Sequence, residues 1–272
     1  MHPDRDPGDA DPRLPHHGFD PGPRVLDRRL TDCAKPEIIG FVSSNSLSLA
    51  AALAEEARFS TLWRRCVNNA PSPAADAVYA HLCRLLGGSD RHYHNLEHIR
   101  ECLRYFDEVA PLLRDPDAVE VALWFHDAEY TPGDATNERR SAELFIRLSG
   151  GAAPAFRRRV CGLIFATRHA IVARTADRRF IEDIDLIGFG ASWEQFMHHG
   201  DLLRVEFTRQ PDKQYYAGQV AFLELLQRRP VFFTTDFFHS RFEANARENL
   251  NRLLALRTSE GFVSPQSTQF SL

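Results

Sequence analysis

Apolar side chains recur every three to four residues along most of the chain after residue 46, and this period limits the possible folds more than any other feature. One such stripe contains Leu53, Ala57, Leu62 and Val67, which is the spacing of one face of an α-helix. No stretch shows the sustained alternation of polar and apolar residues that a half-buried strand requires. The sequence therefore predicts an all-α fold, a single bundle of about eight to ten helices.

Capping and helix-breaking residues divide this helical sequence into segments. Asn95, Asn137 and Ser192 are expected N-caps, and the pairs Gly87-Gly88 and Gly150-Gly151 are expected helix ends. The expected helices begin at residue 46, at Pro73 and at the Asn95 and Asn137 caps, with others at 117–127, 154–167, 178–188, 192–207, 211–228 and 240–257.

Composition divides the chain into one large domain and two tails. Residues 1–36 are rich in Pro, Asp, Arg and Gly and lack the apolar surface that a folded core needs, so we expect a disordered tail there. Residues 37–260 form the predicted domain, and residues 261–272 form a C-terminal tail. A net charge of −4 provides no general basic field, which argues against a nucleic acid polymer as partner.

The cysteines and the hydropathy suggest a cellular compartment. The five cysteines are odd in number, widely spaced and without a CxxC pair, so neither a disulfide framework nor a thiolate zinc site is expected. Four of them, Cys66, Cys83, Cys102 and Cys161, fall in helical patterns, where we expect buried small hydrophobic residues. No apolar run approaches the ~20 residues that span a bilayer. We expect a cytoplasmic protein without a membrane partner, and homo-oligomer formation stays open.

The doublet His126-Asp127 closes an apolar run and carries the first indication of chemistry. His98 precedes it and Asp185 follows it. Two imidazoles and two carboxylates suit a divalent ion such as Mn, Co, Ni, Fe, Zn or Mg. Neighbouring residues on a helix diverge by about a third of a turn, so His126 and Asp127 can share an ion only at a helix end or between their two directions.

Five ordered blocks extend this pattern over roughly residues 50–257. They are Tyr93-His94-Asn95-Leu96-Glu97-His98, Trp124-Phe125-His126-Asp127-Ala128-Glu129-Tyr130, Asn137-Glu138 with Ser141-Ala142, Thr167-Arg168-His169, and Asp183-Ile184-Asp185-Leu186. Together they resemble a bacterial subfamily of predicted metal-dependent phosphohydrolases in the HD superfamily, whose substrates are generally unassigned. The resemblance implies an HD-like helical domain and metal ligation by His98, His126, Asp127 and Asp185.

The resemblance also suggests roles around the ion. Asp183 competes with Asp185 as ligand, but the second Asp of the motif matches the ligand position, which leaves Asp183 as a supporting partner or helix cap. Arg91, His94 and His169 are candidate phosphate-binding residues, and His169 is also a candidate ligand of a second metal. Asp127 is a candidate proton acceptor.

The sequence departs from some HD nucleotidases at Tyr130, where those proteins carry a Glu that orients the attacking water. Glu138 is the candidate replacement as a catalytic residue, with Asp134 as the other carboxylate near it. The alternative for Glu138 is a purely structural role, as a negative charge that stabilises a helix N-terminus. The later aromatic residues, from Phe189 to Phe238, are expected in the core, although a tyrosine among them could contact a substrate.

These observations favour hydrolysis of a small phosphoester, either a phosphorylated metabolite or a nucleotide. Two alternatives stay open. The same ligands could serve an HD-fold di-iron oxygenase, with His94 and His169 as extra ligands. They could also belong to a non-catalytic HD module that binds a nucleotide.

Overall fold

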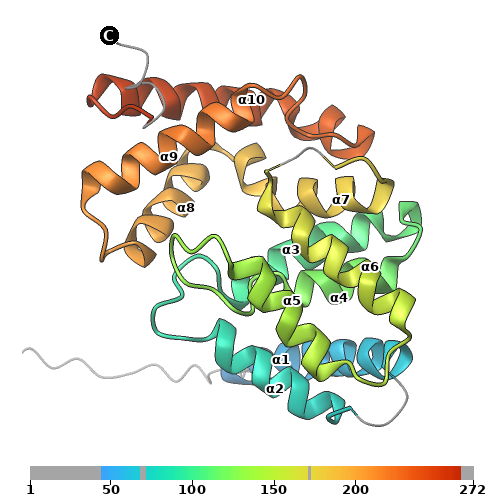
Figure 1. Ribbon diagram of the computed structural model, residues 1–272. Helices are drawn as coiled ribbons and strands as arrows, with labels where there is room; N and C mark the ends of the chain where they lie inside the picture. Colours follow the sequence, from blue (N-terminus) through green and yellow to red (C-terminus); the bar gives the residue numbers. More distant parts are fainter. Residues whose placement is uncertain (1–43, 68–71, 171–172, 265–272) are drawn as a thin grey trace, which may run out of the picture. The chain divides into compact units, whose positions relative to one another are not determined.

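The computed structural model describes residues 44–67, 72–170 and 173–264. Within these ranges all regular elements are helical (Figure 1), which confirms the all-α prediction. Ten α-helices are present there: α1 (Ser44–Cys66), α2 (Ala75–Leu86), α3 (Leu96–Val109), α4 (Pro116–Phe125), α5 (Asn137–Leu148), α6 (Pro154–Ile164), α7 (Ala176–Asp185), α8 (Trp193–Glu206), α9 (Asp212–Gln227) and α10 (Asp236–Ser259). Three 3₁₀ turns accompany them: η1 (Ala110–Leu112), η2 (Phe165–Arg168) and η3 (Ile187–Gly190).

The described helices belong to one compact unit that begins at Ser44. The tail expected at residues 1–36 lies outside the described residues, and so do residues 265–272 of the expected C-terminal tail. No helix in the described ranges combines the length and apolar character needed to cross a bilayer.

Helix α4 lies at the centre of the helices α1–α7 (Figure 1). Asp115 caps it by accepting a hydrogen bond from the Ala118 amide, and Pro116 fits the first turn, where an amide hydrogen has no helical partner. From Ala118 to Phe125 all its residues are buried. A helix that is apolar on all sides must be surrounded by others, and α4 packs against α3, α5, α6 and α1.

One charged residue of α4 is buried with its partner. Glu120 accepts a hydrogen bond from Arg58 Nε of α1 at 2.6 Å, and the same guanidinium forms two more with Asp107 of α3. Burial raises the pKa of Glu120, and Arg58 opposes that shift. The ion pair therefore fixes α1 against α3 and α4 while compensating a costly buried charge.

Asp183 joins α7 to the start of α10. Its carboxylate accepts hydrogen bonds from the amides and hydroxyls of Thr234 and Thr235 at 2.7–3.2 Å. Thr235 is the N-cap residue of α10. Asp183 thus anchors the segment that leads into α10, about fifty residues further along the chain, and does not cap the helix in which it lies.

Several expected helix boundaries differ from the structure: the helices expected at 154–167, 178–188 and 240–257 are Pro154–Ile164, Ala176–Asp185 and Asp236–Ser259. Asn137 does not cap α5: Thr136 is the N-cap residue, and the Asn137 amide is hydrogen-bonded to both backbone groups of Thr131. The helix expected to end at residue 127 ends at Phe125. By contrast, Asn95 caps α3 and Ser192 caps α8, as predicted.

Candidate metal centre and adjoining cavity

Three separate helices, α3, α4 and α7, bring the expected metal ligands to one point. His98 lies in the first turn of α3, and His126 and Asp127 follow the last residue of α4. Asp185 is the last residue of α7. His126 continues the helical backbone by one residue and Asp127 follows it, so both side chains reach the cluster from the C-terminal end of α4. The arrangement over a helix end is the geometry that the sequence required.

The spacing of the donor atoms suits one ion. His126 Nε2 lies 3.0 Å from Asp127 Oδ2 and 3.3 Å from both Asp185 Oδ1 and His98 Nε2. His98 Nε2 lies 3.2 Å from Asp185 Oδ1 and 3.6 Å from Asp127 Oδ2. Ligands held about 2.0–2.2 Å from a common ion are separated by roughly 2.8–3.6 Å in octahedral or tetrahedral geometry. All five distances fall in that range.

The tautomer of His126 also suits a metal. Its Nδ1–H donates to the Leu123 carbonyl at 2.8 Å, and a carbonyl can only accept. In the neutral imidazole the lone pair is therefore on Nε2, which faces the two carboxylates and His98. Such an arrangement is repulsive unless a proton or a cation occupies the centre. A backbone carbonyl behind a ligating histidine is the usual support of a metal site.

The pKa shifts have the same electrostatic origin. Burial would lower the pKa of His126, but Asp127 and Asp185 outweigh it and raise the pKa well above its usual value. Burial would raise the pKa of Asp185, yet His126, His169 and His98 hold it well below its usual range. The carboxylates and the imidazoles thus stabilise each other's charged forms, and a cation could supply the same positive charge.

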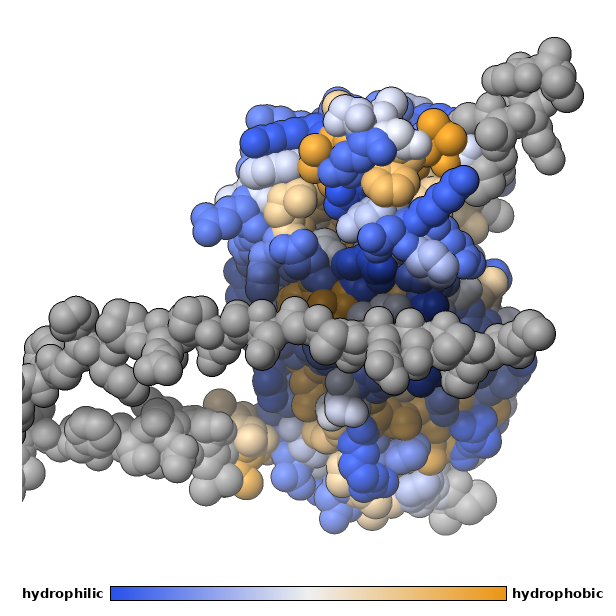
Figure 2. All heavy atoms as spheres, turned by 90° about the vertical axis from the view of Figure 1, so that its left-hand side faces the viewer, coloured by the Kyte–Doolittle hydropathy of each residue, from blue (hydrophilic) through white to orange (hydrophobic). Residues whose placement is uncertain are grey.

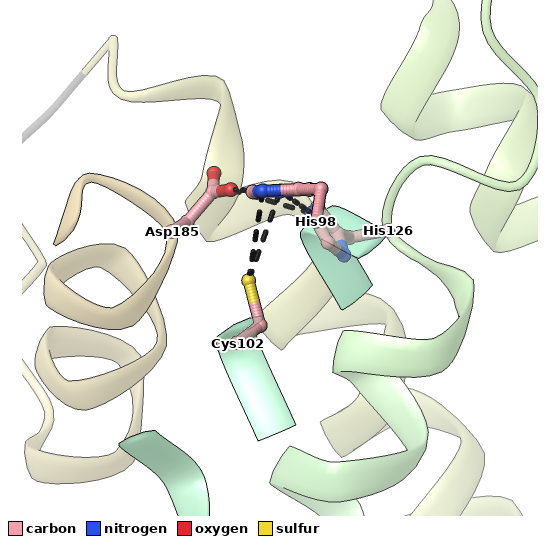
Figure 3. A group of neighbouring side chains, drawn as sticks. All are labelled: His98, Cys102, His126 and Asp185. Atoms are coloured by element: carbon pink, nitrogen blue, oxygen red, sulfur yellow. Dashed lines mark hydrogen bonds and ion pairs between the residues drawn. The ribbon is translucent and has the colours of Figure 1, made fainter. Parts of the chain in front are cut away.

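Cys102 is the donor that sequence reasoning missed. It is fully buried, as expected, but its Sγ lies 3.7 Å from His98 Nε2, one helical turn away (Figure 3). Donor atoms of His98, Cys102, His126 and Asp185 all lie within 4.8 Å of one another. This buried group could hold a metal ion. The signal was available in the sequence, since residues i and i+4 share a helix face, but a lone cysteine among apolar residues gave no reason to use it.

His169 extends the cluster beyond Asp185. Its Nε2 lies 2.8 Å from Asp185 Oδ2, the oxygen that does not face His98 and His126. The residue follows η2 with a φ of 54°, a left-handed conformation that is uncommon for residues with a side chain. Its carbonyl accepts a hydrogen bond from Arg229 at 2.7 Å, which helps to hold this conformation. Among the described residues His169 Nδ1 has no hydrogen-bond partner.

Glu206 fixes the position of His94, and nothing in the sequence indicated it. Its Oε1 accepts the amides of His92, Tyr93 and His94 at 2.8–2.9 Å, and its Oε2 pairs with His94 Nδ1 at 2.7 Å. Burial would raise the pKa of Glu206, but the hydrogen bonds from His94 and these amides lower it.

The His94 ring is fixed from its other side as well. It stacks on Tyr130 with ring centroids 4.1 Å apart, and both rings line the cavity described below. The tyrosine that replaces the expected Glu therefore orients a histidine.

Arg91 lies behind the doublet, outside the cavity lining. Its guanidinium donates to the carbonyls of His94, Asp127 and Ala128 at 2.8–3.0 Å and lies over the ring of Tyr130. These contacts hold the segment after α4 in place. The structure gives Arg91 a positioning role and does not bring it to the site expected for phosphate.

Of the two candidate carboxylates, Glu138 reaches the cavity. It lies in the first turn of α5, where burial, with Asp127 and Asp185, raises its pKa against the opposing effects of a backbone hydrogen bond and Arg168. Arg168 Nε lies 3.7 Å from its carboxylate. Asp134 instead accepts hydrogen bonds from Thr136 and Arg140 and closes the turn before α5.

A cavity of about 670 Å³ opens beside the cluster. At one end lie Asp127, Asp185, His94, His169 and Glu138. The other walls come from η3, α8, α9 and α10. Several aromatic residues expected in the core line this cavity, namely Phe189, Phe196, Phe207, Tyr215 and Phe222, whereas Phe232, Phe233 and Phe238 are fully buried as expected.

Comparisons with known proteins returned no significant match to a protein-family model, a curated protein or a solved structure.

Proposed function

We propose that this protein is a metal-dependent phosphohydrolase of the HD superfamily that acts on a small phosphoester. The observation that supports the proposal is the convergence of four donor atoms, from His98, His126, Asp127 and Asp185, at the end of a cavity. A divalent ion held there would lower the pKa of a bound water and polarise a phosphoryl oxygen. The ordered sequence blocks agree with this chemistry.

The residues around the ion would have different roles in phosphoester hydrolysis. Asp127 and Glu138 are the candidate proton acceptors, and burial, which raises the pKa of Glu138, makes its carboxylate a stronger base than an exposed one. His94, oriented by Glu206 and Tyr130, can donate to a phosphoryl oxygen or to the leaving group. His169 is held on the outer oxygen of Asp185, where it can stabilise charge that develops on phosphate.

A di-iron oxygenase is the second candidate, because Asp185 presents one oxygen to His98 and His126 and the other to His169. An Asp in that position could bridge two ions. The other histidine expected for a second iron, His94, pairs through Nδ1 with Glu206, which leaves its Nε2 free and does not separate the two candidates.

The test uses the full chain purified without chelator. Bound metals are measured by elemental analysis, and release of phosphate from mono- and diesters is followed after loading with Mn, Co, Ni, Fe, Zn or Mg. We expect close to one ion per chain and turnover that Asp185→Asn abolishes. Two irons per chain with oxygen consumption would instead support the oxygenase, and stoichiometric metal without turnover of any ester would contradict the hydrolase.

A further inference from the structure

The walls of the cavity change character with distance from the metal centre. Near the cluster they carry carboxylates and imidazoles. Between η3, α8, α9 and α10 they carry aromatic and aliphatic side chains, including Phe196, Met197, Phe222 and Leu253. The exposed polar residues Asp201 and Gln214 also line the cavity. On the face shown in Figure 2, hydrophobic residues are recessed between hydrophilic ones. The cavity thus has one end that carries the metal-binding groups and a chamber whose walls are mainly apolar.

Charge on the walls limits how many phosphates can enter. Of the described residues that line the cavity, Arg257 alone is a lysine or arginine. Its guanidinium already pairs with Glu260 and donates to Gln219, both at 2.8 Å. Four carboxylates line the same space: Asp127, Glu138, Asp185 and Asp201. A divalent ion held by Asp127 and Asp185 would coordinate one phosphate directly. Further phosphates would meet uncompensated negative charge, because phosphate chains are bound by cations and free amides.

Two glycines enlarge the apolar chamber. Gly200 lies inside α8 and Gly218 inside α9, and both line the cavity. A Cβ atom built on either glycine meets nothing within 4 Å. Glycine in a helix interior destabilises the helix relative to alanine, and no close packing at these positions requires it. Both positions therefore leave open space beside the cavity wall, Gly200 at a half-buried site and Gly218 at an exposed one.

We propose that the substrate is a phosphomonoester of an apolar alcohol, with its phosphate at the metal centre and its aliphatic or aromatic body in the chamber. This inference deepens the proposed function and rests on it. The volume of about 670 Å³ lies within the roughly 300–1,000 Å³ typical of small-ligand pockets. A nucleoside triphosphate fits the charge of the walls poorly, and a sugar phosphate would leave the apolar walls uncovered.

Binding and turnover test the proposal separately. Calorimetry measures the Kd of alkylphosphonates from two to ten carbons with the metal-free and the metal-loaded protein. Phosphate release is measured from the matching alkyl phosphates and from AMP, ATP and glucose 6-phosphate. We expect Kd to fall, and kcat/KM to rise, by about two- to fourfold for each added methylene until the chamber is full.

Variants of the two glycines locate the effect. Gly200→Leu and Gly218→Leu fill the chamber and should end the gain at a shorter chain length without loss of bound metal. Ala255→Leu, which adds the same side chain at an exposed position of α10 outside the cavity, should keep the wild-type series. Thermal unfolding verifies that all three variants are folded.

The outcomes separate the two proposals. Three results would overturn the apolar substrate while leaving the hydrolase in place. They are a Kd that does not depend on chain length, a higher kcat/KM for AMP, ATP or glucose 6-phosphate than for octyl phosphate, and glycine variants that behave as wild type. Chain-length-dependent binding without hydrolysis under any metal would instead refute the hydrolase and keep the ligand class.

Discussion

Replacing Glu206 with glutamine should change the hydrogen bonding of the His94 ring, although the two residues lie 112 positions apart in the sequence. The Glu206 side chain is fully buried and accepts four hydrogen bonds. In Glu206→Gln the side-chain oxygen can still accept the hydrogen bonds from the three backbone N–H groups. The amide NH₂ then faces His94 Nδ1, so neutral His94 must move its proton to Nε2, and the charged form of the ring loses its counter-ion.

The size of the effect follows from these contacts. A hydrogen bond to a charged group contributes about 1.5–3 kcal/mol, against about 0.5–1.5 kcal/mol for a neutral one. We expect a loss of about 2 kcal/mol in the free energy of unfolding, and a Tm lower by roughly 4–8 °C for a chain of this size. If protonated His94 assists phosphate transfer, the same lost interaction lowers kcat by roughly 10–100-fold, since a factor of ten corresponds to about 1.4 kcal/mol.

The assay compares Glu206→Gln with a matched control. Glu243 also accepts backbone amides, from Phe232 and Phe233, pairs with Arg247 and lies outside the cavity lining. Glu243→Gln should lower Tm by a similar amount without changing kcat. Glu206→Gln should lower both, with metal content unchanged. Equal Tm losses with an unaltered kcat in both variants would refute the role assigned to His94.

The pH dependence of stability tests the direction in which the pKa of each of these two glutamates is shifted. For both Glu206 and Glu243, burial raises the pKa but hydrogen bonds outweigh it, so the folded pKa lies below the usual value. Their ionised forms therefore stabilise the fold above about pH 4.3, the unfolded pKa, and this contribution disappears as pH falls toward the folded pKa. The Tm difference between wild type and either variant should shrink below about pH 4.3, and a difference that grows there would contradict the assignment.

Five further substitutions test the metal centre and the residues around it. His126→Ala and Asp127→Ala should each lose bound metal while the circular dichroism stays helical, and full metal occupancy would remove them from the ligand set. Glu138→Gln should lower kcat by about 10²–10⁴-fold with little effect on metal affinity if it is a general base, whereas an unchanged kcat with a slightly lower Tm would make it structural. Cys102→Ala should weaken the binding of Zn and Co more than that of Mg, since soft ligands favour Zn and Co. It should also remove any thiolate charge-transfer band from the spectrum of the Co form. Identical Co spectra for wild type and variant would show that the thiol does not bind the ion. Arg91→Lys should lower metal affinity about 10–100-fold, because one ammonium cannot span three carbonyls, and an unchanged affinity would make those hydrogen bonds dispensable.

The helices and the principal donors could be predicted from sequence because both depend on local pattern. Apolar period, N-caps such as Asn95 and Ser192, and glycine pairs act within a few residues, and α3 and α8 begin where those signals placed them. His98, His126, Asp127 and Asp185 were selected by residue type and order, and the structure places them around one point.

Tertiary structure alone decided the partners of these residues. Glu206 reaches His94, and Asp183 reaches Thr235, across 112 and 52 positions of sequence. Such contacts depend on how helices pack, and a carboxylate in a helical pattern looks the same whether it faces water or another chain segment. Asn137 shows a competition within the local sequence, since this good capping residue instead bonds the backbone of Thr131, six positions earlier. The cavity also belongs to this class: its walls come from several elements, and their aromatic residues have the spacing of ordinary core. Sequence thus determined which groups were available, and packing determined what they face.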